Sequence, residues 1–347
     1  MLWSIWAASL VLAAMSLVAM AGLIVSRLLS LGKARRLAEH REKLVAGLLA
    51  WLEGEAAEWD VGKLLAREKA LAIDVLIELF ENMRGDEQGK LAALADRVGL
   101  TAHIHRILRK GRIRDRLVAA ECLTWFPSEA TVNALRKALD DKSLDVSLAA
   151  AASLMDLSPD VPLEDMLAGR LDRRDSSRRL EDLLGRAARR DPERLLRVAE
   201  DEARTDRVRA AALEALAQAG ASDFLERIVT LEQSQSVDVR AAVARCLGAI
   251  GHPSCEPVIG RMLADPAWQV RVRAADAAGT LGSLALGELL CVLIEDPNWW
   301  VRLRSAEALA KLGDVGIGWL KDIVASETNI ASAQTAALVL AERRNVA

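Results

Sequence analysis

The sequence predicts an all-α protein in which paired helices stack into a right-handed superhelix, preceded by one transmembrane helix. Composition is the first observation behind this fold class. Aromatic residues form only 3% of the chain, tyrosine is absent, and alanine and leucine supply most of the apolar content. Such residues favour helices, whereas strands favour β-branched and aromatic residues. The second observation is a 31-residue repeat in the C-terminal half, a period typical of solenoids, in which each unit buries its apolar face against its neighbours.

The first element in chain order is predicted to cross a membrane. No charged residue occurs from Leu2 to Val25, and about 24 residues form a helix of about 36 Å, which exceeds a hydrocarbon core of about 30 Å. No Lys or Arg precedes this segment, and several follow it, beginning with Arg27. The positive-inside rule then places the N-terminus outside and the solenoid in the cytoplasm. We therefore predict a transmembrane helix over residues 2–25 of a single-pass protein, as in a bacterial inner membrane.

A cleaved signal peptide is the alternative for this segment. Ala19-Met20-Ala21 resembles a small-residue cleavage site, and cleavage there would leave a periplasmic solenoid. However, the basic n-region is missing, and the apolar run continues as far as Val25, beyond that site. These two features favour the anchor.

Two helical regions are expected between the membrane and the solenoid. In residues 26–56, apolar residues such as Leu37, Leu44 and Leu48 recur at helical spacing opposite a charged face. This pattern predicts a basic amphipathic juxtamembrane helix, its basic start near lipid and its apolar stripe against the solenoid. Residues 57–111, with helices expected over 60–83, 88–97 and 101–109, do not follow the 31-residue register. They are predicted to form an irregular helical N-terminal cap.

The solenoid itself is predicted over residues 112–347. A Val-Arg pair and a later glycine mark each clear unit: Val208-Arg209, Val239-Arg240, Val270-Arg271 and Val301-Arg302, then Gly220, Gly251, Gly282 and Gly313. Leu117 and Val146 extend the register toward the N-terminus, so units should begin near 112, 143, 174, 206, 237, 268 and 299. A last helix over 330–343 caps the array. We expect two helices per unit, the second opening with Val-Arg and ending at the glycine, which suits the left-handed position after a helix.

These units resemble short HEAT repeats of the phycobilisome-lyase-like kind. The resemblance rests on alanine-rich second helices, such as Val239 to Gly251, and on Asp-Pro before the second helix, at Asp265-Pro266 and Asp296-Pro297. It covers roughly residues 112–343 and implies an α-solenoid. It says little about function, because HEAT arrays serve many roles.

Catalytic and cofactor sites are not expected. The iron-dependent hydroxylases of this repeat class use His-Glu dipeptides as ligands, and none of the four histidines (His40, His103, His105, His252) is followed by Glu. His103 and His105 are two residues apart, so they point to different helix faces and cannot share a metal as an i, i+4 pair would. The four cysteines lack CxxC spacing, and Cys246 occupies the place of a small core residue. We predict no metal, no cofactor and no enzymatic activity.

Charge argues against a nucleic-acid partner, since the formal net charge is −3 and the pI is about 6.0. The most charged segment, residues 170–197, contains ten arginines and six acidic residues. We expect a solvated helix pair with i, i+4 salt bridges there. Contact with an acidic partner or a phosphate is the alternative.

The candidate partner surface lies along the second helices, which line the concave face of a solenoid. Trp and Arg are the residues most enriched at interaction hot spots, so we predict partner binding by the following residues: Arg240, Arg271, Arg273, Arg302, Arg304, Trp268, Trp299 and Trp300. Arg after Val can also serve the fold, by pairing with an acidic residue in the next turn. Of the adjacent Trp299 and Trp300, at least one should be partly exposed, because both rings cannot be buried on one side.

The predicted function is that of a membrane-anchored, non-catalytic scaffold. It would bind a membrane-associated protein partner at the cytoplasmic face, as part of an envelope assembly or transport machine. Two alternatives stay open. One is a lyase-like HEAT protein that binds a small molecule or chromophore on its concave face, and the other is the periplasmic solenoid released by signal cleavage.

Overall fold

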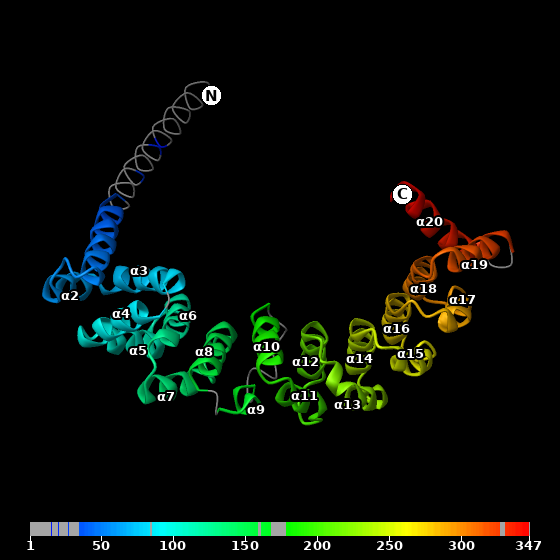
Figure 1. The fold of residues 1–347 in the computed structure, drawn as a ribbon, viewed down its shortest axis with the longest axis horizontal. Coiled ribbons are helices and arrows are strands. Elements are labelled where there is room, and N and C mark those ends of the chain that lie inside the picture. The colour runs from blue at the N-terminus through cyan, green and yellow to red at the C-terminus, as the bar shows by residue number, and fades with distance from the viewer. Residues whose placement is uncertain are drawn as a thin grey trace, which may run out of the picture. The chain divides into compact units, whose positions relative to one another are not determined.

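The computed structural model describes residues 15, 20, 27, 35–83, 85–158, 161–167, 178–326 and 330–346. Within these ranges the regular structure is helical, which confirms the all-α prediction (Figure 1). The chain forms two compact units, the first ending at Thr131 and the second beginning at Val132. The predicted transmembrane helix over 2–25 lies, apart from Met15 and Met20, outside the described residues. None of the helices in the described ranges combines the length and the hydropathy needed to span a bilayer.

The first unit is a stack of short helices. Residues 35–52 are helical, and five helices follow: α2 (Glu58–Arg67), α3 (Lys69–Asn82), α4 (Asp86–Arg97), α5 (Leu100–Lys110) and α6 (Ile113–Cys122). Leu44 and Leu48 of the first helix are buried, whereas Leu37 is 54% exposed. The apolar stripe of this helix is therefore buried at Leu44 and Leu48 but not at Leu37. At Gly47, beside them, the helix lies against Leu64 and Val61 of α2, which belong to the predicted cap and not to the predicted solenoid.

One predicted boundary in this unit is wrong. The single helix expected over 60–83 is two helices, because the backbone leaves the helical region at Glu68, where φ is −127° and ψ is 64°. No glycine or proline stands there, so the sequence carries no ordinary signal for the break. The side chain of Glu68 contacts Nδ1 of His40 at 2.6 Å, which ties the break to the helix over residues 35–52.

The second unit has two rows of helices. The inner row contains α8 (Leu144–Leu157), α10 (Arg178–Arg190), α12 (Asp206–Ala219), α14 (Val237–Ile250), α16 (Trp268–Leu281), α18 (Trp299–Lys311) and α20 (Ile330–Val346). The outer row contains α9 (Leu163–Met166), α11 (Pro192–Glu200), α13 (Leu225–Thr230), α15 (Glu256–Met262), α17 (Gly287–Leu293) and α19 (Asp314–Ala325). α7 (Glu129–Ala138) spans the boundary between the units. Figure 1 shows the inner row on the concave side of unit 2.

The 31-residue register is visible in the helix starts. α12, α14, α16 and α18 begin at residues 206, 237, 268 and 299. The sequence predicts unit starts near these positions, and each helix begins two residues before the Val-Arg pair that was expected to open it. Each of these helices packs against the next one in the inner row, and Val239, Val270 and Val301 are completely buried between the rows. Burial of a valine side chain contributes about 1.5–3 kcal/mol, so the repeated valine is one source of the stability of the stack.

Small residues bring the inner helices close together. A Cβ added to Gly248 on α14 would lie 2.8 Å from Cα of Ala277 on α16, and one added to Gly279 on α16 would lie 2.8 Å from Cα of Ala308 on α18. The two contacts are one period apart. Side chains larger than hydrogen would force these helices apart, because the opposing atoms belong to backbone.

The terminal glycines close the inner helices as expected. Gly220, Gly251 and Gly282 are left-handed, with φ of 72°, 64° and 70°, a conformation that glycine adopts without a steric cost. The fourth, Gly313, differs from the prediction. Its φ is 74° but its ψ is −149°, and it precedes the first residue of α19.

Candidate interaction groove

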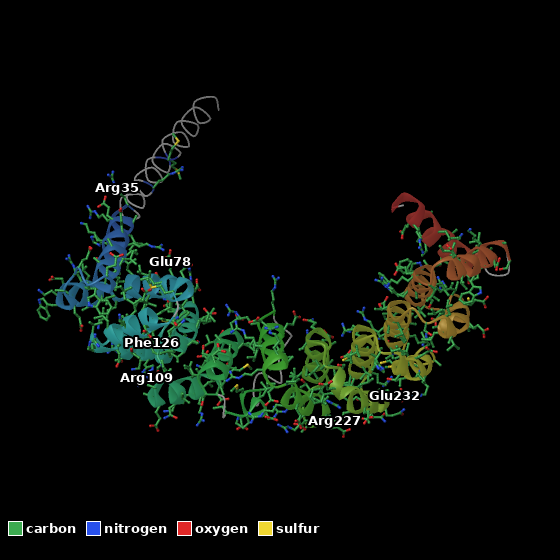
Figure 2. All side chains as sticks on the ribbon, in the orientation of Figure 1. Arg35, Glu78, Arg109, Phe126, Arg227 and Glu232 are labelled. Carbon is green, nitrogen blue, oxygen red and sulfur yellow. The ribbon has the colours of Figure 1, made fainter. Side chains whose placement is uncertain are left out.

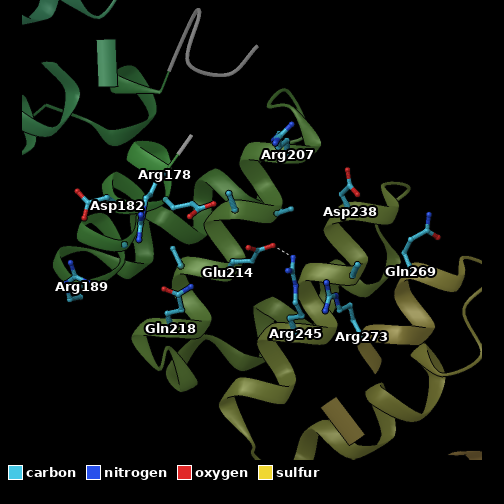
Figure 3. A pocket seen from close by; sticks show the side chains of 16 residues that line it. Arg178, Asp182, Arg189, Arg207, Glu214, Gln218, Asp238, Arg245, Gln269 and Arg273 are labelled. Atoms are coloured by element: carbon cyan, nitrogen blue, oxygen red, sulfur yellow. Dashed lines mark ion pairs between the residues drawn. The ribbon is translucent and has the colours of Figure 1, made fainter. Parts of the chain in front are cut away.

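A groove of about 760 Å³ crosses four helices of the inner row. It runs over α10, α12, α14 and α16, and Figure 3 shows the side chains that point into it. Five arginines, four carboxylates and two glutamines line it. Because each helix presents residues from the same register positions, such as Arg207, Asp238 and Gln269, the groove is a product of the repeat.

One ion pair crosses the middle of the groove. Arg245 on α14 pairs with Glu214 on α12 (Figure 3). The Nε atom of Arg245 is buried and has no hydrogen-bond partner among the described residues. Burial lowers the pKa of Arg245, and the positive charge of Arg273 on α16 lowers it further. The middle of the groove therefore holds a guanidinium whose environment does not fully compensate its charge.

A second set of charges continues along the inner row. Arg273 lies 3.6 Å from the carboxylate of Asp276, which also faces Arg304 at 3.8 Å. Arg304 in turn pairs with Glu307 at 2.6 Å. Burial raises the pKa of Asp276, against the opposing effect of the neighbouring arginines. The predicted site residues Arg273 and Arg304 are thus partly exposed cations that share a carboxylate.

Of the predicted arginines, Arg273 lines the groove, whereas Arg240, Arg271, Arg302 and Arg304 are not among its lining residues. Arg240 binds Asp265 through Nε and Nη2, at 2.7 and 3.0 Å. Arg271 binds Asp296 in the same way, at 2.8 and 3.0 Å. The reason is helical geometry: on α14 the groove is lined by Asp238, Ala241 and Arg245, and a residue at 240 points away from that face.

These arginines join consecutive repeats. Arg271 also donates from Nη1 to the carbonyls of Asp265 and Pro266, at 2.9 and 3.1 Å, and its side chain is only 14% exposed. Arg240 and Arg271 therefore each have an acidic partner, Asp265 and Asp296. This is the structural alternative that the sequence left open. Their assignment to partner binding stays a prediction.

Arg302 completes the series with one difference. Its Nη1 donates to the carbonyls of Asp296 and Pro297, at 2.9 and 3.1 Å. Its Nε is buried without a hydrogen-bond partner among the described residues. The residue one period after Asp296 is Glu327, which lies outside those residues.

The three predicted tryptophans begin helices of the inner row. Trp268 is the first residue of α16, and Trp299 and Trp300 are the first two of α18. Their exposed fractions are 39%, 45% and 48%, which confirms that the adjacent pair is partly exposed. The rings of Trp299 and Trp300 meet edge to face, with centroids 4.7 Å apart. Trp300 stands one period after Gln269, a groove residue.

The arginine-rich segment is partly described. Residues 168–177 lie outside the described ranges. In the rest, Arg186 pairs with Asp182 at 3.1 Å and Arg197 with Glu193 at 3.9 Å, both at i, i+4 spacing. The predicted salt-bridged helix pair is thus present, and Arg178 and Arg189 from it line the groove.

Sequence reasoning missed several groove residues. Arg245, Glu214, Gln218 and Gln269 were not singled out, although they line the groove. A signal for Arg245 does exist. The equivalent positions in neighbouring units are Glu214, Asp276 and Glu307, so Arg245 reverses the charge of its repeat position.

Histidines and cysteines lie away from the groove. Nε2 of His105 is 3.1 Å from Oγ1 of the buried Thr131, and Cys246 is fully buried, as expected of a small core residue. In the described part of the chain, His, Cys, Asp and Glu side chains do not gather in groups of three or more that could hold a metal.

Comparison with known families identifies the repeat. Residues 192–262 and 255–341 match the family model of HEAT repeats. These overlapping matches cover α11 to α20, apart from the end of α20. This part of the chain therefore consists of HEAT repeats, as the resemblance implied. Comparison with curated proteins gave no significant match.

Several solved structures are similar to the chain at low identity. Human deoxyhypusine hydroxylase in complex with glycerol is 18% identical, over 81% of this chain and 98% of that one, with a TM-score of 0.32. The complex of CpcE and CpcF of phycocyanin lyase from Nostoc sp. PCC7120 is 17% identical, over 78% and 94%, with a TM-score of 0.28. The karyopherin Kap121p, bound to the extreme C-terminus of a protein phosphatase, is 13% identical with a TM-score of 0.47. There the match covers 89% of this chain but only 44% of the karyopherin.

Proposed function

We propose that the protein is a non-catalytic HEAT-repeat scaffold that binds a protein partner in the groove of α10, α12, α14 and α16. The observation that carries this proposal is the lining of the groove. Arginines, carboxylates and glutamines from four successive repeats face one continuous hollow. A polypeptide segment can satisfy such a lining along its length, because it offers backbone donors and acceptors together with varied side chains.

The lining disfavours the small-molecule alternative. A volume of about 760 Å³ falls in the range of ligand pockets, but such pockets are mostly apolar and contain few polar groups. Here charged and amide side chains predominate. A chromophore of the kind that a lyase holds would bury its apolar rings against charges, which is unfavourable.

We also propose that residues 2–25 anchor the scaffold to a membrane, with the solenoid on the cytoplasmic side. The support is the uncharged N-terminal stretch and the basic residues that follow it. The side chain of Arg35, at the beginning of the described helix (Figure 2), is 85% exposed, so it is available to anionic lipid. Membership of an envelope assembly or transport machine belongs to the same proposal.

A groove-filling variant tests the binding proposal. Ala211 lines the groove, and Ala211→Trp would place a large ring in the space that a partner segment needs. Ala285, exposed next to the outer row, provides the matched control Ala285→Trp. In a mild-detergent pull-down, Ala211→Trp should lose a partner that both wild type and Ala285→Trp retain. Equal recovery with all three proteins would contradict the proposal, as would a bound chromophore in the absorption spectrum of the purified protein.

The anchor has its own test. Deletion of residues 2–25 should move the protein from the alkaline-washed membrane pellet to the supernatant, and the intact mass of the full-length protein should include these residues. A mature N-terminus after Ala21 would favour the periplasmic alternative instead.

A further inference from the structure

Positions 214, 245, 276 and 307 are equivalent in the four clear repeats, and three of these four residues are acidic. Glu214, Asp276 and Glu307 occupy the position on α12, α16 and α18, and Arg245 occupies it on α14. A second change accompanies the first. Arg273 and Arg304 stand where the two preceding units have alanine, at 211 and 242. These departures from the repeat concentrate positive charge in the middle of the concave face.

The consequence is a break in an otherwise alternating series of charges. From α12 to α14 the series passes through Glu214 and Arg245, and from α16 to α18 through Asp276 and Arg304. Between α14 and α16, however, two arginines follow each other in the series, Arg245 and Arg273. The positive charge of Arg273 disfavours the charged form of Arg245. Both arginines point into the groove in Figure 3.

The contacts within the fold do not fully satisfy the guanidinium of Arg245. Its Nε is buried with no hydrogen-bond partner among the described residues, although Glu214 pairs with its Nη2. A guanidinium has five N–H donors and can bind more than one carboxylate, so the pair with Glu214 leaves donors of Arg245 for a further anion. An anion at the junction would neutralise the repulsion between the two arginines.

We infer that the partner segment held in the groove is acidic, and that one of its carboxylates bridges Arg245 and Arg273. This inference rests on the proposed protein-binding function. It adds that the bound segment is acidic and that Arg245 and Arg273 recognise one of its carboxylates.

The carboxylates of the groove select a peptide over a nucleic acid. Glu181, Asp182, Glu214 and Asp238 line the same hollow as the arginines. A nucleic-acid strand carries a phosphate at every nucleotide and would bring negative charge against all four. A peptide can place one carboxylate at the Arg245–Arg273 junction and polar groups elsewhere, where Gln218 and Gln269 offer an amide donor and acceptor each.

The test uses synthetic peptides as probes of the full-length protein in detergent. Three fluorescent 15-residue peptides share a Ser-Gly background and carry Glu, Gln or Lys at the same single central position, and a fluorescent single-stranded oligonucleotide is the fourth probe. The Arg245→Gln and Arg273→Gln variants are compared with Arg261→Gln. Arg261 lies on α15 in the outer row with 56% of its side chain exposed, so it controls for loss of one surface arginine.

Fluorescence anisotropy should show the Glu peptide binding at least tenfold more tightly than the Gln and Lys peptides, with an affinity that falls as salt rises. Arg245→Gln and Arg273→Gln should each weaken this binding about tenfold, as expected for loss of a charge-assisted hydrogen bond, and Arg261→Gln should not. Circular dichroism confirms that the variants are folded. Equal binding of the Glu and Gln peptides, tighter binding of the oligonucleotide, or indifference to both groove substitutions would overturn the inference.

The Ala211→Trp variant and the two arginine variants distinguish two outcomes. If Ala211→Trp releases a partner but Arg245→Gln and Arg273→Gln do not, the groove binds a protein and the acidic segment is wrong. If Ala211→Trp has no effect on any partner, the proposed function itself is wrong.

Discussion

Arg271 on α16 and Asp296, in the turn before α18, form a two-point ion pair that joins one repeat to the next. The Nε and Nη2 atoms of Arg271 donate to the two carboxylate oxygens at 2.8 and 3.0 Å, and the Asp296 side chain is only 5% exposed. The same carboxylate accepts from the backbone N–H of Asn298 at 2.8 Å. One period earlier, Arg240 and Asp265 repeat the arrangement.

The Arg271→Ala variant should lose about 2–4 kcal/mol of unfolding free energy, because it leaves a buried carboxylate without its cation. Urea denaturation followed by circular dichroism at 222 nm measures the change. Arg271→Ala/Asp296→Ala should cost less than the sum of the two single changes. A loss no larger than that of Arg97→Ala, which breaks only the exposed pair with Glu58, worth about 0–1 kcal/mol, would show that the Arg271–Asp296 pair is not structural.

Close helix packing makes a second prediction. Gly279→Ala should destabilise the protein by about 1–3 kcal/mol, because the new Cβ would lie 2.8 Å from Cα of Ala308 on the next helix. Gly318→Ala on α19 is the matched control, since its Cβ meets nothing within 4 Å, and it should stabilise by about 0.5–1 kcal/mol. Thermal melts of the two variants should shift in opposite directions. Shifts of the same sign would contradict the tight contact between α16 and α18.

Protonation of Asp265 should lower the stability of the folded protein in acid. Burial alone would raise the pKa of this carboxyl, but the hydrogen bonds from Arg240 and from the N–H of Ala267 outweigh burial and lower the pKa. A lowered pKa in the folded state means that Asp265 contributes stability above its unfolded pKa of about 4, and that this contribution is lost as the pH falls through the folded value. The Asp265→Asn variant should therefore be less stable than wild type at pH 7, and the difference should shrink toward pH 3. Unfolding curves between pH 3 and 7 test this, and a constant difference would refute it.

Cysteine labelling tests the packing of the inner row. Burial raises the pKa of Cys246 to about 12, and that of Cys122 to about 12 as well. The thiolate is the reactive form, so both should resist iodoacetamide at pH 8 in the folded protein. Cys291, which is less buried, should be labelled first, and peptide mass spectrometry reports the order. Labelling of Cys246 ahead of Cys291 would indicate that α14 is not packed as described.

The register of the repeat accounts for what the sequence could predict. Because Val239, Val270 and Val301 must face the same core, the spacing placed the starts of α12, α14, α16 and α18 to within two residues. It also located the glycines that end the first three of these helices. The sequence did not predict the break at Glu68, because no local residue opposes a helix there. The break coincides instead with a tertiary contact between Glu68 and His40.

The site was harder to predict than the fold. The arginine that follows valine in each repeat was predicted to bind a partner because it recurs regularly. An ion pair between repeats produces the same regularity, as Arg240 and Arg271 show. Arg245 is the opposite case, since it breaks the pattern of its position. Its pairing with Glu214 could not be predicted from the sequence, because it depends on how α12 packs against α14.

Site-specific photo-crosslinking in the native cell tests the central claim, that the inner-row groove holds a protein partner, most directly. A benzoyl-phenylalanine at position 269 replaces Gln269 in the groove, and one at position 261 replaces Arg261 on the outer row. We predict one discrete protein adduct from position 269, absent from position 261 and lost when Ala211→Trp fills the groove. Identical adduct patterns at the two positions, or no adduct at 269 that depends on Ala211, would contradict the account.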